Sequence, residues 1–208
     1  MKGLLLKDFY MLLSKNLRIF LLMLAVFLGI SFVDYGDIFF VIYPVLITGI
    51  LPSNLQSYDE QSKWTSYSAA LPCSRAQIVS AKYLICLLME LAILLLAILV
   101  RAVQMLVRGV FAPLELLTLA AGILALALTI PAVTMPFLFK FGAEKGRLLF
   151  ILSIALLTGI STFASIHIMD NGLTVPSGHL LALVLLAAIA LYIGSWLLSI
   201  AFYQKKDL

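Results

Sequence analysis

Long runs of apolar residues alternate with short polar segments along the whole chain. Six of these runs approach or exceed the roughly 20 residues that a helix needs to cross a bilayer, and they cover residues 17–33, 38–55, 78–100, 116–139, 148–169 and 180–202. The runs are continuous, whereas membrane barrels show short segments of alternating polarity. The pattern predicts an all-α polytopic membrane protein with six transmembrane helices, folded as a single domain over residues 1–208.

Prolines mark two of the predicted helices. Pro44 and Pro52 lie in the second run, and Pro131 and Pro136 lie in the fourth. A proline removes one backbone hydrogen bond and clashes with the preceding turn, so neighbouring helices must compensate within the bilayer. The second helix is therefore the weakest of the six, and we expect a kink near one end of the fourth.

The N-terminal segment, residues 1–16, begins an amphipathic pattern. At about 100° per residue, one side of a helix would carry Lys7, Ser14, Lys15 and Arg18, and another would carry Leu5, Phe9, Leu12, Leu13 and Leu17. Because basic residues recur over this whole stretch, it does not resemble a cleaved signal peptide. We expect an N-terminal amphipathic helix lying along the membrane interface. The alternative is a simple extension of the first span into the headgroups.

Composition supports a membrane location and excludes several classes. Hydrophobic residues make up 63% of the chain and charged residues 12%, whereas a soluble domain is about half apolar and a quarter charged. Two cysteines, Cys73 and Cys86, are too few for a disulfide scaffold. Six spans also leave no room for a folded soluble domain of about 100 residues. Soluble chemistry would therefore have to come from a partner.

The distribution of lysine and arginine predicts the orientation. With the N-terminus in the cytoplasm, the inner segments hold all the basic residues except Arg101 and Arg108, which is twelve of the fourteen. This excess is typical of cytoplasmic loops. We therefore expect a multi-pass protein of the plasma membrane with both termini inside. The net charge of +4 then matches anionic inner-leaflet lipid and does not indicate nucleic acid.

The longest polar segment, residues 56–77, lies on the predicted cytoplasmic side between the second and third spans. We call it the 56–77 loop. Trp64 and Tyr67 are three positions apart and would share a helix face. Ser74 is a suitable N-cap for the third span, and Gln77 would complete a capping box. An ordered loop is therefore expected, with ordinary interfacial anchoring by Trp64 as the alternative.

A string of residues in and after this loop is specific enough to compare with known families. It comprises Asp59, Glu60, Trp64, Tyr67, Leu71, Pro72, Ser74, Arg75, Ile78, Val79, Lys82 and Tyr83. The string resembles the signature loop in permease subunits of bacterial type-2 (exporter class) ABC transporters, in particular the small six-span group. The two ends of the chain, residues 1–8 and 202–208, are also similar to the ends of that group.

The resemblance implies a mechanism. Two permeases, identical or related, would pair above two cytoplasmic ATPase subunits that bind ATP and Mg²⁺, and this chain would hold no cofactor or metal. The 56–77 loop would form a coupling helix in a groove of each ATPase. Trp64 and Tyr67 would then be packing anchors, and Asp59, Glu60 and Arg75 polar contacts. Residues 1–16 would be the connecting helix, and the short 167–178 segment would lie at the outer mouth.

Other chemistry is poorly supported. No G-x-x-x-x-G-K-[ST] phosphate loop occurs in the sequence, so ATP hydrolysis by that mechanism requires a separate subunit. Residues 176–179 match one motif of the membrane phosphatases, but the arginine-proline pair and the second histidine of those enzymes are missing. A turn followed by an N-cap is the better interpretation of these four residues. The lone His167 is best interpreted as a rim residue.

Glu90 is an acidic residue deep in an apolar run. It follows Lys82 by eight positions, which places it about 12 Å further along the helix. Such a group is costly unless it faces protein or water. It either lines the transport path or makes a protonated or hydrogen-bonded packing contact. The sequence leaves the substrate open, and a channel or a membrane assembly or immunity factor without an ATPase remains the competing class.

Overall fold

The computed structural model describes residues 2–31, 37–68, 73–170 and 178–205. Within them it has eight α-helices and no strand. The helices are α1 (Lys2–Ser31), α2 (Asp37–Thr48), α3 (Leu51–Gln61), α4 (Trp64–Ser68), α5 (Arg75–Val107), α6 (Pro113–Phe141), α7 (Ala143–Asp170) and α8 (Gly178–Gln204). The all-α prediction is confirmed for this part of the chain.

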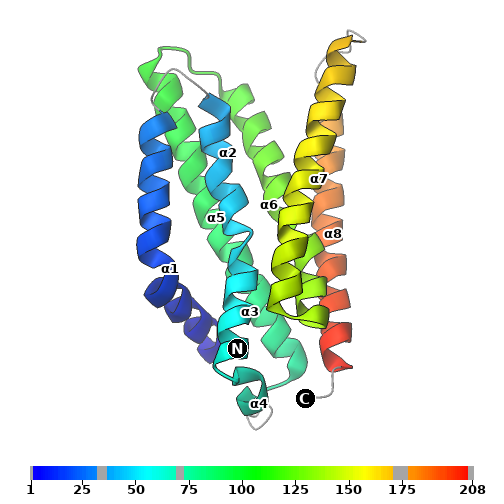
Figure 1. The fold of residues 1–208 in the computed structure, drawn as a ribbon. Coiled ribbons are helices and arrows are strands. Elements are labelled where there is room, and N and C mark those ends of the chain that lie inside the picture. The colour runs from blue at the N-terminus through cyan, green and yellow to red at the C-terminus, as the bar shows by residue number, and fades with distance from the viewer. Residues whose placement is uncertain (1, 32–36, 69–72, 171–177, 206–208) are drawn as a thin grey trace.

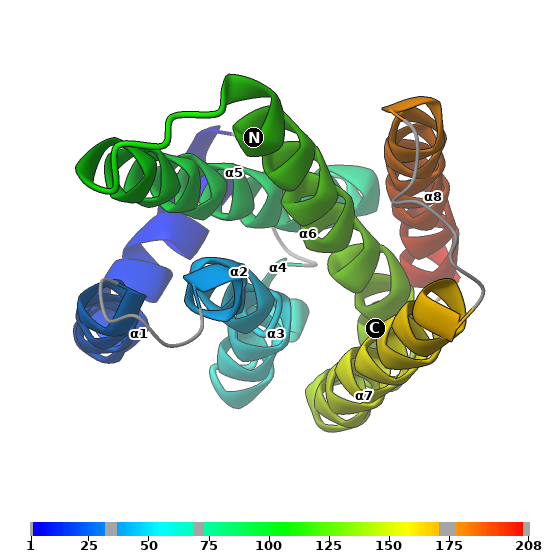
Figure 2. The same cartoon turned by 90° about the horizontal axis from the view of Figure 1, so that it is seen from above.

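The long helices run side by side as a bundle (Figure 1). The start of α1, the short α4 and the end of α8 lie at the same end of the bundle. Seen from above, α6 lies between α5 on one side and α7 and α8 on the other (Figure 2). It packs against all three of these helices, so it is the central element of the C-terminal half.

Three helices in the described part are long and apolar enough to cross a membrane, namely Arg75–Val107, Pro113–Phe141 and Leu181–Gln204. They correspond to the predicted third, fourth and sixth spans. The count of six spans remains a prediction from the sequence. α6 continues through Pro131 and Pro136.

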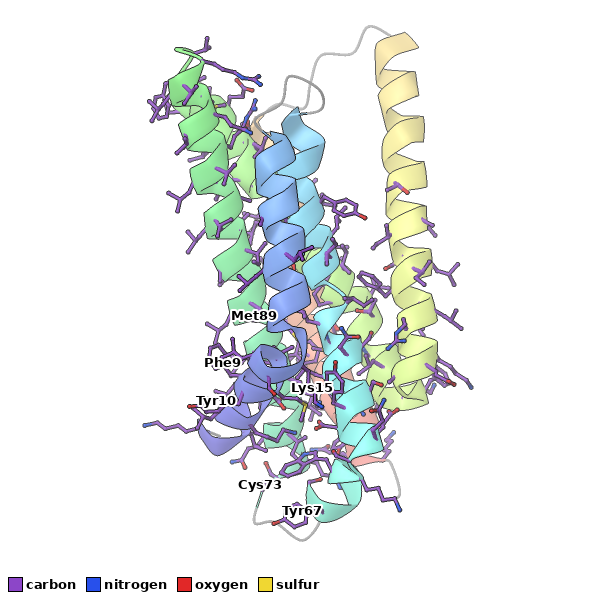
Figure 3. The ribbon with its side chains drawn as sticks, turned by 60° about the vertical axis from the view of Figure 1, so that its left-hand side comes forward. Phe9, Tyr10, Lys15, Tyr67, Cys73 and Met89 are labelled. Carbon is purple, nitrogen blue, oxygen red and sulfur yellow. The ribbon has the colours of Figure 1, made fainter. Side chains whose placement is uncertain are left out.

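The N-terminal segment and the predicted first span form one helix, α1. Its first third is inclined to the remainder (Figure 1). Leu4, Asp8 and Leu12 are buried against the bundle, because positions four apart share a helix face. Phe9 and Tyr10 are exposed on the outer side of this segment (Figure 3). An apolar outer face of this kind suits a membrane interface, although the segment is continuous with the first span and not a separate helix.

The predicted second span is two helices. α2 ends at Thr48 and α3 begins at Leu51, with a turn at Gly49 and Ile50. Pro44 is accommodated inside α2, whereas Pro52 lies in the first turn of α3, where a missing N–H costs nothing. α3 then continues to Gln61, past the expected end of the span at Leu55.

Candidate coupling site

Asp59, near the end of α3, is the centre of a buried ionic cluster. Its carboxylate accepts hydrogen bonds from Lys7 Nζ at 2.7 Å and from Lys82 Nζ at 2.6 Å. Lys7 Nζ also lies 3.1 Å from a carboxylate oxygen of Asp8. The side chains of Asp59 and Lys82 are 2% and 5% exposed. Two lysines and two aspartates balance in charge, which is what a buried ionic group requires.

Trp64 packs against the same cluster from α4. Lys7 Nζ lies 4.1 Å from the centre of the Trp64 ring, a distance suited to a cation–π contact. The ring centres of Trp64 and Tyr67 are 5.6 Å apart, so the expected shared face is present. Trp64 is partly buried against the core, whereas Tyr67 is 62% exposed and lies at the lower end of the molecule (Figure 3).

Glu60 joins the 56–77 loop to α7. Its carboxylate oxygens lie 3.1 and 3.4 Å from the backbone N of Ala143, the first residue of α7. A carboxylate is favoured there because the first N–H groups of a helix have no partner within it. The preceding Gly142 has a φ of +92°, and a Cβ at this position would be 3.3 Å from Glu60 Oε1. Glycine therefore permits both the turn and the close approach.

The start of α5 forms the predicted capping box. The Ser74 hydroxyl accepts from the backbone N–H of Gln77, and the Gln77 side chain accepts from the Ser74 N–H, both at 3.2 Å. The next residue, Arg75, donates to the carbonyl oxygens of Gln204 at 2.8 Å and Tyr203 at 3.5 Å. A cation at the C-terminal end of a helix is favourable, so Arg75 holds the end of α8 beside the start of α5.

Tyr83 fixes α5 to α8 directly after Lys82 of the ionic cluster. Its side chain is fully buried, and its hydroxyl lies 2.8 Å from Ser195 Oγ and 2.7 Å from Ser199 Oγ. The ring stacks on Trp196 at a centre distance of 5.5 Å. Tyr192 Oη also donates to the Tyr83 carbonyl at 2.9 Å. Interhelical hydrogen bonds of this kind support helix association in membranes.

Comparison with known families decides which class of membrane protein this is. The profile of the ABC-2 family transporter proteins matches residues 3–204. The chain belongs to the ABC-2 transporter family. The resemblance to this family is thereby confirmed, and a role as a membrane transport component follows from the match over nearly the full length. Neither the curated proteins nor the solved structures contain a match to this ABC-2 permease.

The structure brings most of the predicted coupling residues of the ABC-2 permease together at one end of the bundle. Leu71 and Pro72 lie outside the described residues. Asp59 differs from the expected outward contact, because it is buried and points to partners within the chain; the outward roles of Glu60 and Arg75 stay predictions. Asp59 is 1% exposed, so its side chain has no surface to offer another protein.

Sequence reasoning misses the partners of these residues. The helical pattern assigns Lys7 to an outward polar face, but its side chain points inward to Asp59, and the pattern assigns no role to the buried Asp8. The residues of α8 that contact Tyr83 are also missed, although their spacing in the sequence could have indicated them. Polar and aromatic side chains recur three to four positions apart in an otherwise aliphatic helix, at Tyr192, Ser195, Trp196, Ser199 and Tyr203.

Glu90 lies further along α5, on the same buried face as Cys86. Its side chain is buried, and Oε2 has no hydrogen-bond partner. Such burial is expected of a packing contact between helices, and the role of Glu90 in lining a transport path stays a prediction. In the part of the chain that the structure describes, no group of three or more His, Cys, Asp or Glu residues is placed to hold a metal ion.

Proposed function

We propose that this chain is the membrane-spanning permease subunit of an ATP-binding cassette exporter, driven by a separate cytoplasmic ATPase. The observation that carries this proposal is the set of contacts made by the 56–77 loop. Asp59 joins it to α1 and α5, Glu60 joins it to α7, and Arg75 joins α5 to the end of α8. Movement of one short loop would therefore displace four helices.

The contacts are suited to transmitting force because each involves a charged side chain, and those of Asp59 are also short and made by a buried carboxylate. Charge-assisted hydrogen bonds are about twice as strong as neutral ones, and the low dielectric of a buried site strengthens them further. Tyr83 then passes the movement of α5 to α8 through stacked rings and two hydroxyl contacts. An idle connection between two spans needs none of these links.

The outward side of the loop is the proposed ATPase contact. Gln61, Ser62, Lys63 and Tyr67 are exposed there. Lys63 has a φ of +54°, an uncommon conformation for a residue with a side chain, and it makes the tight turn that projects α4. Tyr67 is the large aromatic residue of this surface, and aromatic anchors carry much of the binding energy at protein interfaces.

The proposed arrangement places the loop and both chain ends in the cytoplasm. All three lie at one end of the bundle, in agreement with the excess of lysine and arginine in the segments assigned to that side. ATP and Mg²⁺ would bind to the ATPase. A second permease, identical or related, would complete the path, in which Glu90 is the candidate intramembrane polar group.

The test is affinity purification of the tagged chain from native membranes in mild detergent, followed by mass spectrometry. We expect a near-stoichiometric ATPase with a phosphate loop. Tyr67→Ala should lower the amount of bound ATPase about fivefold or more, as expected for an interface anchor. Tyr10→Ala is a matched control, because Tyr10 is 61% exposed but lies on the inclined part of α1.

Two results would contradict the proposal. If no ATPase is recovered even after cross-linking, an ATPase-independent channel or an assembly or immunity factor becomes the better interpretation. If Tyr67→Ala and Tyr10→Ala lower ATPase binding equally, the 56–77 loop is not the specific contact. Loss of the Tyr67→Ala protein from the membrane would instead assign Tyr67 a role in folding.

A further inference from the structure

An open groove runs between α6 and α8 on the surface of the bundle. Its volume is about 770 Å³, within the range of roughly 300–1,000 Å³ that small-molecule sites occupy. Small side chains form much of its lining, and Gly194 leaves the α8 wall without a side chain. The residues that matter here are Ala132 and Phe137 of α6 and Ala187, Ala190, Gly194 and Leu198 of α8.

The groove is suited to a hydrocarbon chain. Among its described lining residues, only Ser195 and Lys140 have a polar side chain. The Ser195 hydroxyl is 2.8 Å from that of Tyr83 and is thereby engaged in the core. The length of the groove therefore presents almost nothing but apolar surface, which favours an apolar occupant.

Lys140 provides a positive charge at one end of the groove. It is exposed and lies directly before Phe141, the last residue of α6. Its Nζ is 5.1 Å from the ring centres of both Phe141 and Phe202, so it sits across the ends of the two groove helices. Within the described residues it forms no ion pair, and the nearby Glu144 is not its partner.

We propose that this groove binds an anionic phospholipid, with a hydrocarbon chain along α6 and α8 and the phosphate at Lys140. The exposed Lys145, Arg147 and Lys205 lie near the same ends of these helices, as expected at the headgroup level of the cytoplasmic leaflet. The proposal goes beyond the coupling role and does not depend on it, because none of its residues belongs to the 56–77 loop.

A second copy of the chain is a poorer occupant of the groove. A self-complementary contact would bury Lys140 against the same face of another protomer, and a buried charge needs an opposite charge. α8 contains no Asp or Glu, and Glu115, the acidic residue of α6, is in the first turn at the opposite end of that helix. Glu144 is at the start of α7 and does not line the groove. A phosphate supplies the missing negative charge.

Substitutions at glycine can fill the groove without disturbing the core. A Cβ at Gly194 would meet no atom within 4 Å, so Gly194→Phe should fold and occupy the groove. Gly122→Phe is the matched control, because Gly122 in α6 has equally open space but does not line the groove. Ala190→Leu is a second groove-filling variant in case Gly194→Phe proves unstable. Lys140→Gln removes the charge, with Lys15→Gln as its control, because Lys15 is exposed on α1 and does not line the groove.

The experiment is a titration of the delipidated full chain in detergent with phosphatidylglycerol or phosphatidylcholine, read by native mass spectrometry. The wild type should bind phosphatidylglycerol more tightly. Gly194→Phe or Ala190→Leu should abolish binding of the first lipid molecule, and the Gly122→Phe protein should bind as the wild type does. Lys140→Gln should weaken phosphatidylglycerol about fivefold, the effect of one lysine near a headgroup, and should weaken phosphatidylcholine less, because its choline cation offsets the phosphate charge.

Three results would overturn the proposal. Unchanged lipid binding by both groove-filling variants would place the lipid elsewhere. Equal losses in Lys140→Gln and Lys15→Gln would indicate general surface charge. Dissociation of a dimer by Gly194→Phe, with lipid binding intact, would identify the groove as an interface between two copies of the chain.

Discussion

The carboxylate of Asp59 shows how a charge can be kept inside a membrane protein. It accepts one hydrogen bond from Lys7 at 2.7 Å and one from Lys82 at 2.6 Å, and Asp8 supplies the second negative charge at 3.1 Å from Lys7. Each charge is thus offset by a close neighbour of opposite sign. Removing a single member leaves an unpaired buried charge, whereas removing a matched pair does not.

This charge balance predicts a rescue at the level of single residues. Lys82→Met should lower the free energy of unfolding by about 3–5 kcal/mol, the cost of breaking a buried pair. The double variant Lys82→Met/Asp59→Asn should recover most of the loss, because the Lys7–Asp8 pair remains balanced. Unfolding of the purified proteins in mild detergent measures both effects.

Lys63→Met is the control for this experiment, because Lys63 is an exposed lysine of the same loop. It should leave stability within about 0.5 kcal/mol of the wild type. If the double variant is as unstable as Lys82→Met alone, the ionic cluster does not act as a balanced unit.

At the scale of elements, the turn between α2 and α3 depends on a glycine. A Cβ at Gly49 would lie 2.8 Å from Ile130 Cγ2 and 2.9 Å from Phe150 Cε2. Real Cβ contacts are longer, so these side chains, or the helices α6 and α7 that carry them, would have to shift. The close packing of the α2–α3 turn against two other helices therefore favours glycine at this position.

Gly49→Ala should accordingly destabilise the protein by about 1–3 kcal/mol, the usual cost of overpacking. Gly122→Ala is the matched control, because the space around Gly122 is open. It should be neutral or should stabilise α6 by up to about 1 kcal/mol, since alanine is the better helix former. Thermal unfolding measures the stability of the two variants. If Gly49→Ala and Gly122→Ala changed the stability equally, the α2–α3 turn would be able to relax around the added Cβ.

The elements that the sequence predicts well are those determined by local pattern. The Ser74–Gln77 capping box is predictable because both of its residues lie within one helical turn. The long helices α5, α6 and α8 follow from continuous apolar runs. Pro44 and Pro52 mark the second span as weak, but the close packing of Gly49 against Ile130 and Phe150 is not predictable in this way, because these residues lie in the distant helices α6 and α7.

The candidate site is predictable in composition but not in geometry. The string from Asp59 to Tyr83 identifies the residues, yet their roles depend on distant partners. Asp59 meets a lysine 52 positions earlier in the chain, and Tyr83 meets serines 112 and 116 positions later. A charge or hydroxyl in a sequence does not reveal whether protein or solvent will surround it, which is why the resemblance implies an outward contact for the buried Asp59.

At the scale of the whole molecule, orientation decides whether the coupling proposal is possible, because ATP is supplied from the cytoplasm. The two cysteines provide a direct probe. Cys73, just before α5, is partly exposed, whereas Cys86 is buried within α5. A charged, membrane-impermeant maleimide should therefore react with Cys73 alone, since a buried thiol is inert.

We expect this label in inside-out vesicles and none in right-side-out vesicles, and Cys73→Ala should abolish it. Phe111→Cys in the Cys73→Ala background provides the opposite reporter, because Phe111 is 53% exposed between α5 and α6, at the other end of α5 from Cys73. It should be labelled only in right-side-out vesicles. The reverse pattern for both reporters would place the 56–77 loop outside the cell, where no cytoplasmic ATPase could reach Tyr67, and would rule out the proposed coupling.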